Sequence, residues 1–324
     1  MKARGPSEGK EELNTVTDQE RISLRMPAIN SLASKAGVLI DHVAFIPGGK
    51  TNESYIVFGT DGNRYLARIA GQGTEKFVDR KKEMHNVDVA DRIGVAPKLY
   101  CTDNNNLLLE YIDGTCTTSQ NILFFNGNVD KITEQLRTLH GSKEPFIGEF
   151  SFIHDFHVYK ADFMSTGYPV PDEMRRSEEE LYKMTKWVDE HLSDDVCPIH
   201  SDVVMQNFIF TDERAYMIDW EYSTMSDRYL ELASFCTQNI LAPGVERLFL
   251  KSYFSGSDQV MDYNKFLLFK MSISFMWVYW HLNNVAHNKD AEYNEYRWRM
   301  HLNNAIMCKD EWEERQAKPS TIVD

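Results

Sequence analysis

The sequence PIHSDVVMQNFIF, residues 198–210, places His200, Asp202 and Asn207 within a short apolar run. Burying such polar side chains costs free energy unless they are hydrogen-bonded or bound to a ligand. The three residues therefore either satisfy one another or face a ligand.

A second apolar run, AYMIDWEY at residues 215–222, carries Asp219 and Glu221. We expect VVMQNFIF and AYMIDWEY to be strands joined by the turn TDER, because short apolar runs bounded by turn residues are typical of hairpins. The hairpin would bring Asp219 toward Asn207 and Asp202. Side chains two residues apart share a face of a strand, so Glu221 should lie on the same side as Asp219.

This set of side chains suits phosphoryl transfer. Asn207 and Asp219 supply hard oxygen ligands of the kind that Mg²⁺ prefers, and Glu221 can support the metal through water. Asp202 is left to orient a hydroxyl group and accept its proton, while the metal neutralises phosphate charge. The alternative is that these residues are only loop caps and salt-bridge partners, but the second motif at hairpin distance favours the catalytic interpretation.

Composition limits the class of protein. The 324 residues are 42% hydrophobic and carry a net charge of −14, which argues against a nucleic-acid partner and suits a small cationic substrate. The five cysteines are scattered without a C-x-x-C pair, as expected in a reducing compartment. The richest apolar stretch, FLLFKMSISFMWVYW, contains Lys270 and predicts a buried helix rather than a membrane span. We therefore expect a soluble, cytoplasmic protein without membrane insertion.

The residue composition and the hydrophobic periodicity change along the chain, which predicts an α+β protein in three parts. Residues 1–20 should form a mobile tail, residues 21–113 a small β-rich N-lobe, and residues 114–324 a larger, mainly α-helical C-lobe. The predicted strands are 42–46, 54–59, 64–69 and a hairpin from LYCTD and LLLEYI; the predicted helices are 21–36, 75–93, 128–140, 172–193 and most of 228–316. Between the first strands, Asp61-Gly62 indicates a tight turn.

HSDVVMQN followed by IDWEY resembles the phosphotransfer core of protein-kinase-like small-molecule kinases, which include the choline/ethanolamine kinases and the aminoglycoside phosphotransferases. The resemblance covers about residues 40–305 and implies a bilobal protein-kinase-like fold with ATP and Mg²⁺ as cofactors. It implies that Asp202 is the catalytic base and that Asn207 and Asp219 hold Mg²⁺. His200 is expected to stabilise the catalytic loop through hydrogen bonds.

PGGKTNESYIVF is similar to the nucleotide loop of choline kinases, a G-G-x-T-N-x-x-Y pattern between two strands. Gly48 and Gly49 would let the backbone approach the phosphates closely. Thr51, Asn52 and Ser54 would add hydrogen bonds. Taken alone, the motif is also compatible with an ordinary hairpin turn.

The same resemblance extends to three further nucleotide contacts. Arg68 in RYLARIAG stands where the family has a basic residue facing the nucleotide phosphates, and Glu83 is its expected ion-pair partner. LLLEYIDG resembles the connection between the lobes, so backbone groups from Glu110 to Ile112 would meet adenine.

The acceptor side is indicated by SISFMWVYWHL and AEYNEYRW, which resemble the choline-binding segment of choline kinases. Trp277 and Trp280 lie three residues apart on one helix face, and Tyr293 and Tyr222 would complete an aromatic site for an ammonium group. Core packing is the alternative for the tryptophan pair. The acidic residue that the eukaryotic choline kinases place after IDWEY is not evident, and Glu231 is a candidate to replace it.

These features predict a kinase that transfers the γ-phosphoryl group of ATP to the hydroxyl of a small amino alcohol, with choline as the first candidate. Ethanolamine, an aminoglycoside or another small alcohol are alternative acceptors. A catalytically inactive sensor of a nucleotide or an amine is the alternative from another class. The sequence leaves the oligomeric state open, a homodimer included.

Overall fold

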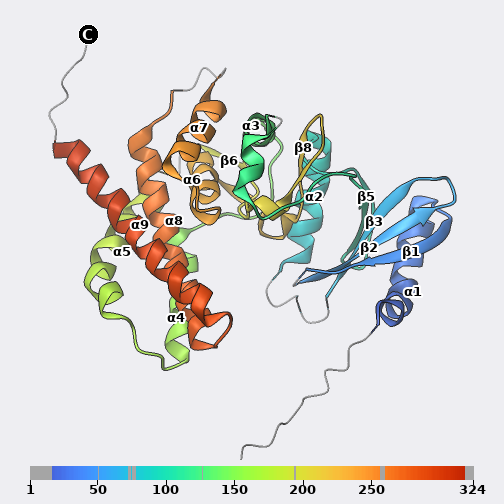
Figure 1. The fold of residues 1–324 in the computed structure, drawn as a ribbon, viewed down its shortest axis with the longest axis horizontal. Coiled ribbons are helices and arrows are strands. Elements are labelled where there is room, and N and C mark those ends of the chain that lie inside the picture. The colour runs from blue at the N-terminus through green and yellow to red at the C-terminus, as the bar shows by residue number, and fades with distance from the viewer. Residues whose placement is uncertain are drawn as a thin grey trace, which may run out of the picture. The chain divides into compact units, whose positions relative to one another are not determined.

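The computed structural model describes residues 17–49, 51–71, 74, 78–125, 127–192, 195–255 and 260–317. The chain divides into two compact units. The first comprises residues up to 75 together with 99–111, and the second comprises 76–98 and the chain from 112 onward. Figure 1 shows a β-rich first part followed by a mainly helical remainder, which confirms the predicted α+β class.

The first unit is a five-stranded antiparallel sheet with one helix packed against it. The sheet has the order β1-β2-β3-β5-β4. Its strands are β1 Ile40–Ile46, β2 Asn52–Gly59, β3 Arg64–Ala70, β4 Leu99–Asp103 and β5 Asn106–Glu110. The helix α1, Asp18–Ala36, buries Ile29 and Leu32 against the sheet residues Tyr55, Val57 and Ala67. The predicted hairpins are therefore confirmed, with the Asp61-Gly62 turn between β2 and β3.

The expected N-terminal tail was partly wrong, because α1 already begins at Asp18. Thr17 caps the helix: its hydroxyl accepts the N–H of Glu20, and the Glu20 carboxylate accepts the N–H of Thr17 in return. Two otherwise unpaired backbone donors are satisfied in this way, which favours a helix start at this point. The remainder of the expected tail, residues 1–16, lies outside the described residues.

The second unit begins with a helix and continues with short strands and helices. Its first elements are α2 Arg80–Ile93, the 3-10 turn η2 Gln120–Phe124, α3 Asn128–His140, α4 Phe152–Ser165 and α5 Asp172–His191. The strand β6, Val196–Ile199, pairs with β9, Thr224–Asp227, and β7, Phe208–Phe210, pairs with β8, Ala215–Met217. The 3-10 turns η3, Met205–Asn207, and η4, Trp220–Tyr222, lie next to this hairpin in sequence.

The C-terminal half of the second unit is helical and contains a large apolar core. Its helices are α6 Arg228–Gln238, α7 Pro243–Phe254, α8 Tyr263–Ala286 and α9 Ala291–Ala317. Helices α8 and α9 pack along one another, as Figure 1 shows, and bury Phe275, Tyr279, Trp298 and Leu302. Within the described ranges, no helix is long and apolar enough to cross a bilayer.

The run that contains Lys270 is a buried helix, as predicted, and its charge is neutralised. Lys270 Nζ lies 2.6 Å from a carboxylate oxygen of Glu246 on α7. Pairing of this kind explains how an ammonium group is tolerated within an apolar helix.

The predicted strands VVMQNFIF and AYMIDWEY were too long. Regular pairing covers only three residues on each side, because Asn207 ends a 3-10 turn and Asp219 adopts a left-handed backbone with φ 70°. The polar residues thus lie at the ends of the hairpin rather than within it.

Candidate functional site

The segment His200–Asn207 forms a loop between β6 and β7, and His200 ties it to the neighbouring hairpin. Its Nε2 lies 2.8 Å from the carbonyl oxygen of Ile218, and its Nδ1 lies 3.3 Å from the N–H of Asp202. A carbonyl can only accept, so Nε2 carries the proton and Nδ1 accepts. With both nitrogens engaged by the backbone, this imidazole orients the loop.

The turn after His200 has an unusual backbone. Ser201 has φ 69°, a left-handed conformation that is uncommon for residues other than glycine. It points two successive N–H groups, those of His200 and Ser201, at one carboxylate oxygen of Glu231, at 2.7 and 2.8 Å. Strained backbone of this kind persists where the surroundings fix it, often at functional sites.

Asp202 and Asn207 are in direct contact. The side-chain amide nitrogen of Asn207 donates to the carbonyl oxygen of Asp202 at 2.8 Å and to its carboxylate at 2.9 Å. The contact fixes the orientation of the carboxylate. Because the amide nitrogen is used in this way, the amide oxygen of Asn207 is the atom that can coordinate a cation.

The hairpin brings Asp219 to the same end of this unit, as the sequence predicted. The N–H of Ile218, the residue before Asp219, donates to the backbone carbonyl of Asn207 at 2.9 Å. Asp202, Asn207 and Asp219 therefore come from adjacent segments at one end of the hairpin.

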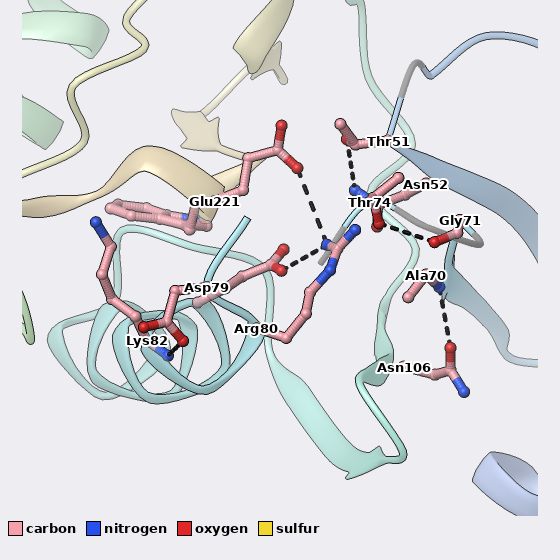
Figure 2. Close-up of polar contacts among 12 residues, drawn as sticks. Thr51, Asn52, Ala70, Gly71, Thr74, Asp79, Arg80, Lys82, Asn106 and Glu221 are labelled. Carbon is pink, nitrogen blue, oxygen red and sulfur yellow. Dashed lines mark hydrogen bonds and ion pairs between the residues drawn. The ribbon is translucent and has the colours of Figure 1, made fainter. Parts of the chain in front are cut away.

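Glu221 reaches the site differently from the prediction. It lies in η4 and not on a strand, so the argument that it shares a strand face with Asp219 was wrong. Its carboxylate lies 4.0 Å from the guanidinium of Arg80 on α2, as Figure 2 shows. Arg80 also donates to Glu83 at 2.8 Å. The side chains of Arg80, Glu83 and Glu221 are only 4%, 2% and 6% exposed, so one buried cation lies between two buried carboxylates.

Arg80 was not identified from the sequence, although it stands in the predicted helix 75–93. Its signal there is weak, because the surrounding residues DRKKE resemble an exposed, charged helix face. The sequence had assigned Glu83 to Arg68; the contact observed for Glu83 within the second unit is with Arg80.

The donor set fits a magnesium ion. Asn207, Asp219 and Glu221 offer one amide oxygen and two carboxylates, all hard oxygen ligands. Among the described residues, no three His, Cys, Asp or Glu side chains gather as a metal site. A set of few protein oxygens suits Mg²⁺ bound with substrate phosphates, because this ion usually keeps several waters and takes only one or two carboxylates.

Trp277 and Trp280 lie on an accessible face of α8. They are partly exposed, whereas the neighbouring Phe275, Met276 and Val278 are buried. The two indole rings are perpendicular, with centroids 5.4 Å apart. Perpendicular aromatic faces of this kind can surround a cationic head group.

Tyr159 on α4 joins this group and was missed by the sequence analysis. Its ring stacks on Trp277, with centroids 6.2 Å apart and planes 20° apart. Burial raises the pKa of Tyr159, and the charges of Asp155, Tyr222 and Asp202 act in the same direction. Nothing in the sequence distinguishes Tyr159 from a core aromatic, because its partners come from other helices.

Tyr222 and Tyr293 lie at the exposed edges of the aromatic group. Tyr222 is 47% exposed, and burial of its hydroxyl together with the carboxylates of Glu221, Asp202 and Asp219 raises its pKa to about 12. Tyr293 is 55% exposed and lies near His281, which contacts Trp280; one face of its ring is covered by Arg297. We call Tyr159, Tyr222, Trp277, Trp280 and Tyr293 the aromatic cluster.

Glu231 does not replace the acidic acceptor residue that the sequence left unassigned. Its carboxylate is fully buried and holds the loop through the N–H groups of His200 and Ser201. Its second oxygen lies 2.8 Å from Nε2 of His140 on α3. The side chain is therefore committed to the loop and cannot face an acceptor.

In the first unit, two glycines of the predicted nucleotide loop have a left-handed backbone or a positive φ. Gly48 and Gly49 have φ 119° and 83°, and a Cβ atom on Gly49 would lie 2.4 Å from the carbonyl oxygen of Asn52. Only glycine fits this second position. The side-chain amide of Asn52 donates to the hydroxyl of Thr51 at 3.1 Å, as Figure 2 shows.

Ser54 and Arg68 are directly opposite one another on β2 and β3, so their side chains share a face of the sheet. This face is opposite to the one that packs on α1, because Tyr55 and Ala67 alternate with them and are buried there. Glu110 ends β5, opposite Tyr65, and Ile112 is the first residue of the second unit after this strand.

Comparison with known proteins agrees with the geometry. The family described as choline/ethanolamine kinase matches residues 43–246. A LicA homolog of Metamycoplasma hominis is 28% identical over 192 residues, covering 59% of this chain and 72% of its own. Human ethanolamine kinase 1 is 30% identical over 172 residues, which cover 49% of this chain and 37% of its own. The crystal structure of choline kinase LicA from Streptococcus pneumoniae superposes with a TM-score of 0.70 at 25% identity, covering 88% and 99% of the two chains.

Proposed function

Because this chain belongs to the choline/ethanolamine kinase family, we propose that it transfers the γ-phosphoryl group of ATP to the hydroxyl group of choline, giving phosphocholine and ADP. The hydroxyl oxygen forms the new bond to phosphorus, the bond to the β-phosphate oxygen breaks, and the hydroxyl proton passes to Asp202. A phosphotransferase of this kind works mainly by positioning and electrostatic stabilisation.

Asp202 suits the role of the base because its carboxylate is already oriented. Asn207 holds it through the amide nitrogen, and His200 accepts the backbone N–H of Asp202. A fixed acceptor spares the reaction the entropy of finding its geometry. Asn207 and Asp219, supported by Glu221, would hold Mg²⁺, which neutralises charge on the phosphates when it is bound.

The residues proposed to bind the nucleotide belong to the predicted loop, to β2 and β3, and to the connection after β5. Gly49, Thr51 and Asn52 would meet the phosphates through backbone and side-chain donors, and Ser54 and Arg68 share a sheet face that can add a hydroxyl and a cation. Glu110 and Ile112 would supply backbone groups for adenine. The role of Glu83 would be to hold the buried Arg80 beside Glu221.

The aromatic cluster is the observation that favours choline as the acceptor. A quaternary ammonium group has no N–H donors, so it is recognised by aromatic faces, whereas a primary ammonium group also needs hydrogen-bond acceptors. Trp277, Trp280 and Tyr159 offer such faces.

One observation favours ethanolamine as a second candidate. Asp155 lies on α4 one helical turn before Tyr159 and is partly buried, and burial raises the pKa of its carboxyl group. A carboxylate at this position can accept hydrogen bonds from a primary ammonium group.

The five cysteines are free thiols, which supports a cytoplasmic location for either reaction.

A panel of acceptors tests the proposal. Mg²⁺-dependent transfer from ATP would be measured for ethanolamine and its mono-, di- and trimethylated derivatives, with spectinomycin as an unrelated acceptor. We expect kcat/KM to rise with each methyl group and to be highest for choline. In Trp277→Ala, kcat/KM for choline should fall by roughly 10- to 30-fold, in line with about 2 kcal/mol for a desolvated cation–π contact. Highest kcat/KM for ethanolamine, or an equal loss for both amines, would overturn the choice of choline.

A further inference from the structure

The loop that carries Asp202 and Asn207 is held at two points by the single helix α6. Near the start of this helix, Glu231 accepts the N–H groups of His200 and Ser201. At its end, the side chain of Asn239 contacts the loop again, between Asp202 and Asn207. The first contact precedes the proposed base, and the second lies inside the segment that separates the base from the proposed metal ligand.

Asn239 pairs with the loop as a neighbouring strand would. Its amide oxygen accepts the N–H of Met205 at 2.8 Å, and its amide nitrogen donates to the carbonyl of Val203 at 2.9 Å. The side chains of Val203 and Met205 are buried. The loop therefore has little freedom to satisfy these backbone groups in another way.

The orientation of Asn239 is itself fixed by α6. Its amide nitrogen also donates to the carbonyl of Phe235 at 2.9 Å, and its backbone N–H donates to the same carbonyl at 3.3 Å. The carbonyl of Phe235 therefore accepts both the backbone N–H and the side-chain amide of Asn239, which fixes this side chain on the last turn of the helix. The side chain thus couples the rigid end of α6 to the backbone of the loop.

We propose that Asn239 is a positioning residue that sets the spacing between the carboxylate of Asp202 and the amide oxygen of Asn207. The inference rests on the proposed roles of these two residues in phosphoryl transfer. Without Asn239, residues 203–205 can shift, and the base and the metal ligand move relative to each other. A displacement of about 1 Å in a catalytic group can cost on the order of 100-fold in rate.

The test compares Asn239→Ala and Asn239→Asp with the wild type. The alanine variant loses both loop contacts, while the nearly isosteric aspartate can still accept from Met205 but cannot donate to Val203. We expect kcat to fall roughly 10- to 100-fold in the alanine variant, with a smaller loss in the aspartate variant, following the cost of misplacing reacting groups. KM for ATP should stay within about twofold, since Asn239 is not proposed to contact the nucleotide.

Asn128→Ala is the matched control. Asn128 is also an amide that donates to a backbone carbonyl, that of Ile122 at 2.9 Å, but it lies on α3 and does not contact the loop. Each substitution removes a side-chain hydrogen bond to a backbone carbonyl, so each is expected to lower stability. If Asn239 were merely structural, the two alanine variants would keep a similar kcat whatever stability each loses, and the inference would be wrong.

Hydrogen exchange separates this inference from the choice of acceptor. In Asn239→Ala, the amide of Met205 should exchange at least about 10-fold faster than in the wild type and in Asn128→Ala, because it loses its acceptor. This readout does not depend on which alcohol is phosphorylated, and kcat can be measured on whichever acceptor the panel identifies. Unchanged exchange at Met205, or faster exchange with unchanged kcat, would refute the positioning role.

Discussion

His140 and Glu231 form a fully buried contact, with Nε2 of the imidazole 2.8 Å from a carboxylate oxygen. The other ring nitrogen of His140 lies 2.7 Å from the hydroxyl of Tyr253. Since the other carboxylate oxygen of Glu231 accepts the N–H groups of His200 and Ser201, a chain of contacts runs from α7 through α3 and α6 to the loop. Buried networks of this kind stabilise a structure only when every member is satisfied.

Replacing Glu231 should therefore affect both folding and turnover. In Glu231→Ala, three buried donors lose their acceptor: the two backbone N–H groups and the His140 ring. We expect a loss of about 3–5 kcal/mol in the free energy of unfolding, measured by urea titration, and a large fall in kcat. His157→Ala, which removes an exposed imidazole near Tyr182, should change neither quantity appreciably. Equal stability of Glu231→Ala and the wild type would contradict the network.

Gly49 and Gly62 share a left-handed backbone but differ in surroundings. Their φ angles are 83° and 81°; a Cβ on Gly49 would meet the Asn52 carbonyl, whereas the space around Gly62 is open. Gly49→Ala should raise KM for ATP by about tenfold or more, because relief of the clash moves the proposed phosphate loop. Gly62→Ala should leave this KM unchanged and lower the free energy of unfolding only by the backbone strain, about 1–2 kcal/mol. Steady-state kinetics with varied ATP decide the point. A similar KM in both variants would remove the nucleotide role of this loop.

The sequence predicted those parts of the fold that depend on local patterns. The hairpins of the first unit follow from β-branched and aromatic runs bounded by turns, and α3 has the predicted bounds of 128–140. The loop motif identified Asp202, Asn207 and Asp219 as neighbours, because a hairpin connects them. In each case the information lies within about 20 residues of chain, where periodicity and turn chemistry act.

The remaining features depend on contacts between distant segments. Asn239 meets Met205 across 34 positions, and His140 meets Glu231 across 91. Tyr159 stacks on a ring from another helix, and Arg80 lies beside Glu221. Such partners leave no periodic signal in a single sequence. The left-handed backbone at Asp219 shortened the predicted strand for a related reason: local propensity does not report strain that tertiary contacts impose.

Arg80 and Arg92 lie on the same helix but in opposite environments. Arg80 is 4% exposed between Glu83 and Glu221, whereas Arg92 is 48% exposed beside Asp88 and Glu144. Arg80→Met leaves two buried carboxylates without this cation and should lower the free energy of unfolding by about 3–5 kcal/mol. Arg92→Met should change the free energy of unfolding little, because solvent screens exposed ion pairs. Chemical denaturation of both variants measures the difference; equal losses would show that the guanidinium of Arg80 does not stabilise the carboxylates.

We expect the buried histidines His281 and His301 to lower the stability of the protein in mild acid. The two rings stack with centroids 5.1 Å apart, and both are buried. Burial lowers the pKa of His281 to about 4, with Arg297 acting in the same direction and Asn294 opposing it. Burial, His281 and Arg297 lower the pKa of His301 well below its usual value of 6.5. Both imidazoles are therefore neutral in the folded protein at neutral pH.

Stability falls in acid because the pKa of each of these histidines is lower in the folded chain than in the unfolded chain. Below pH 6.5 the unfolded chain binds protons at these histidines and the folded chain does not, so stability is fully present above pH 6.5 and falls toward pH 4. Between pH 7 and 5 His281 should contribute a loss of about 2 kcal/mol, at about 1.4 kcal/mol per pH unit below 6.5, and His301 should contribute a loss in the same direction. Urea unfolding of His301→Gln at several pH values should show a shallower decline over this range than the wild type. His191→Gln, which removes an exposed histidine, should leave the decline unchanged; parallel curves for His301→Gln and the wild type would mean that His301 is protonated in the folded state.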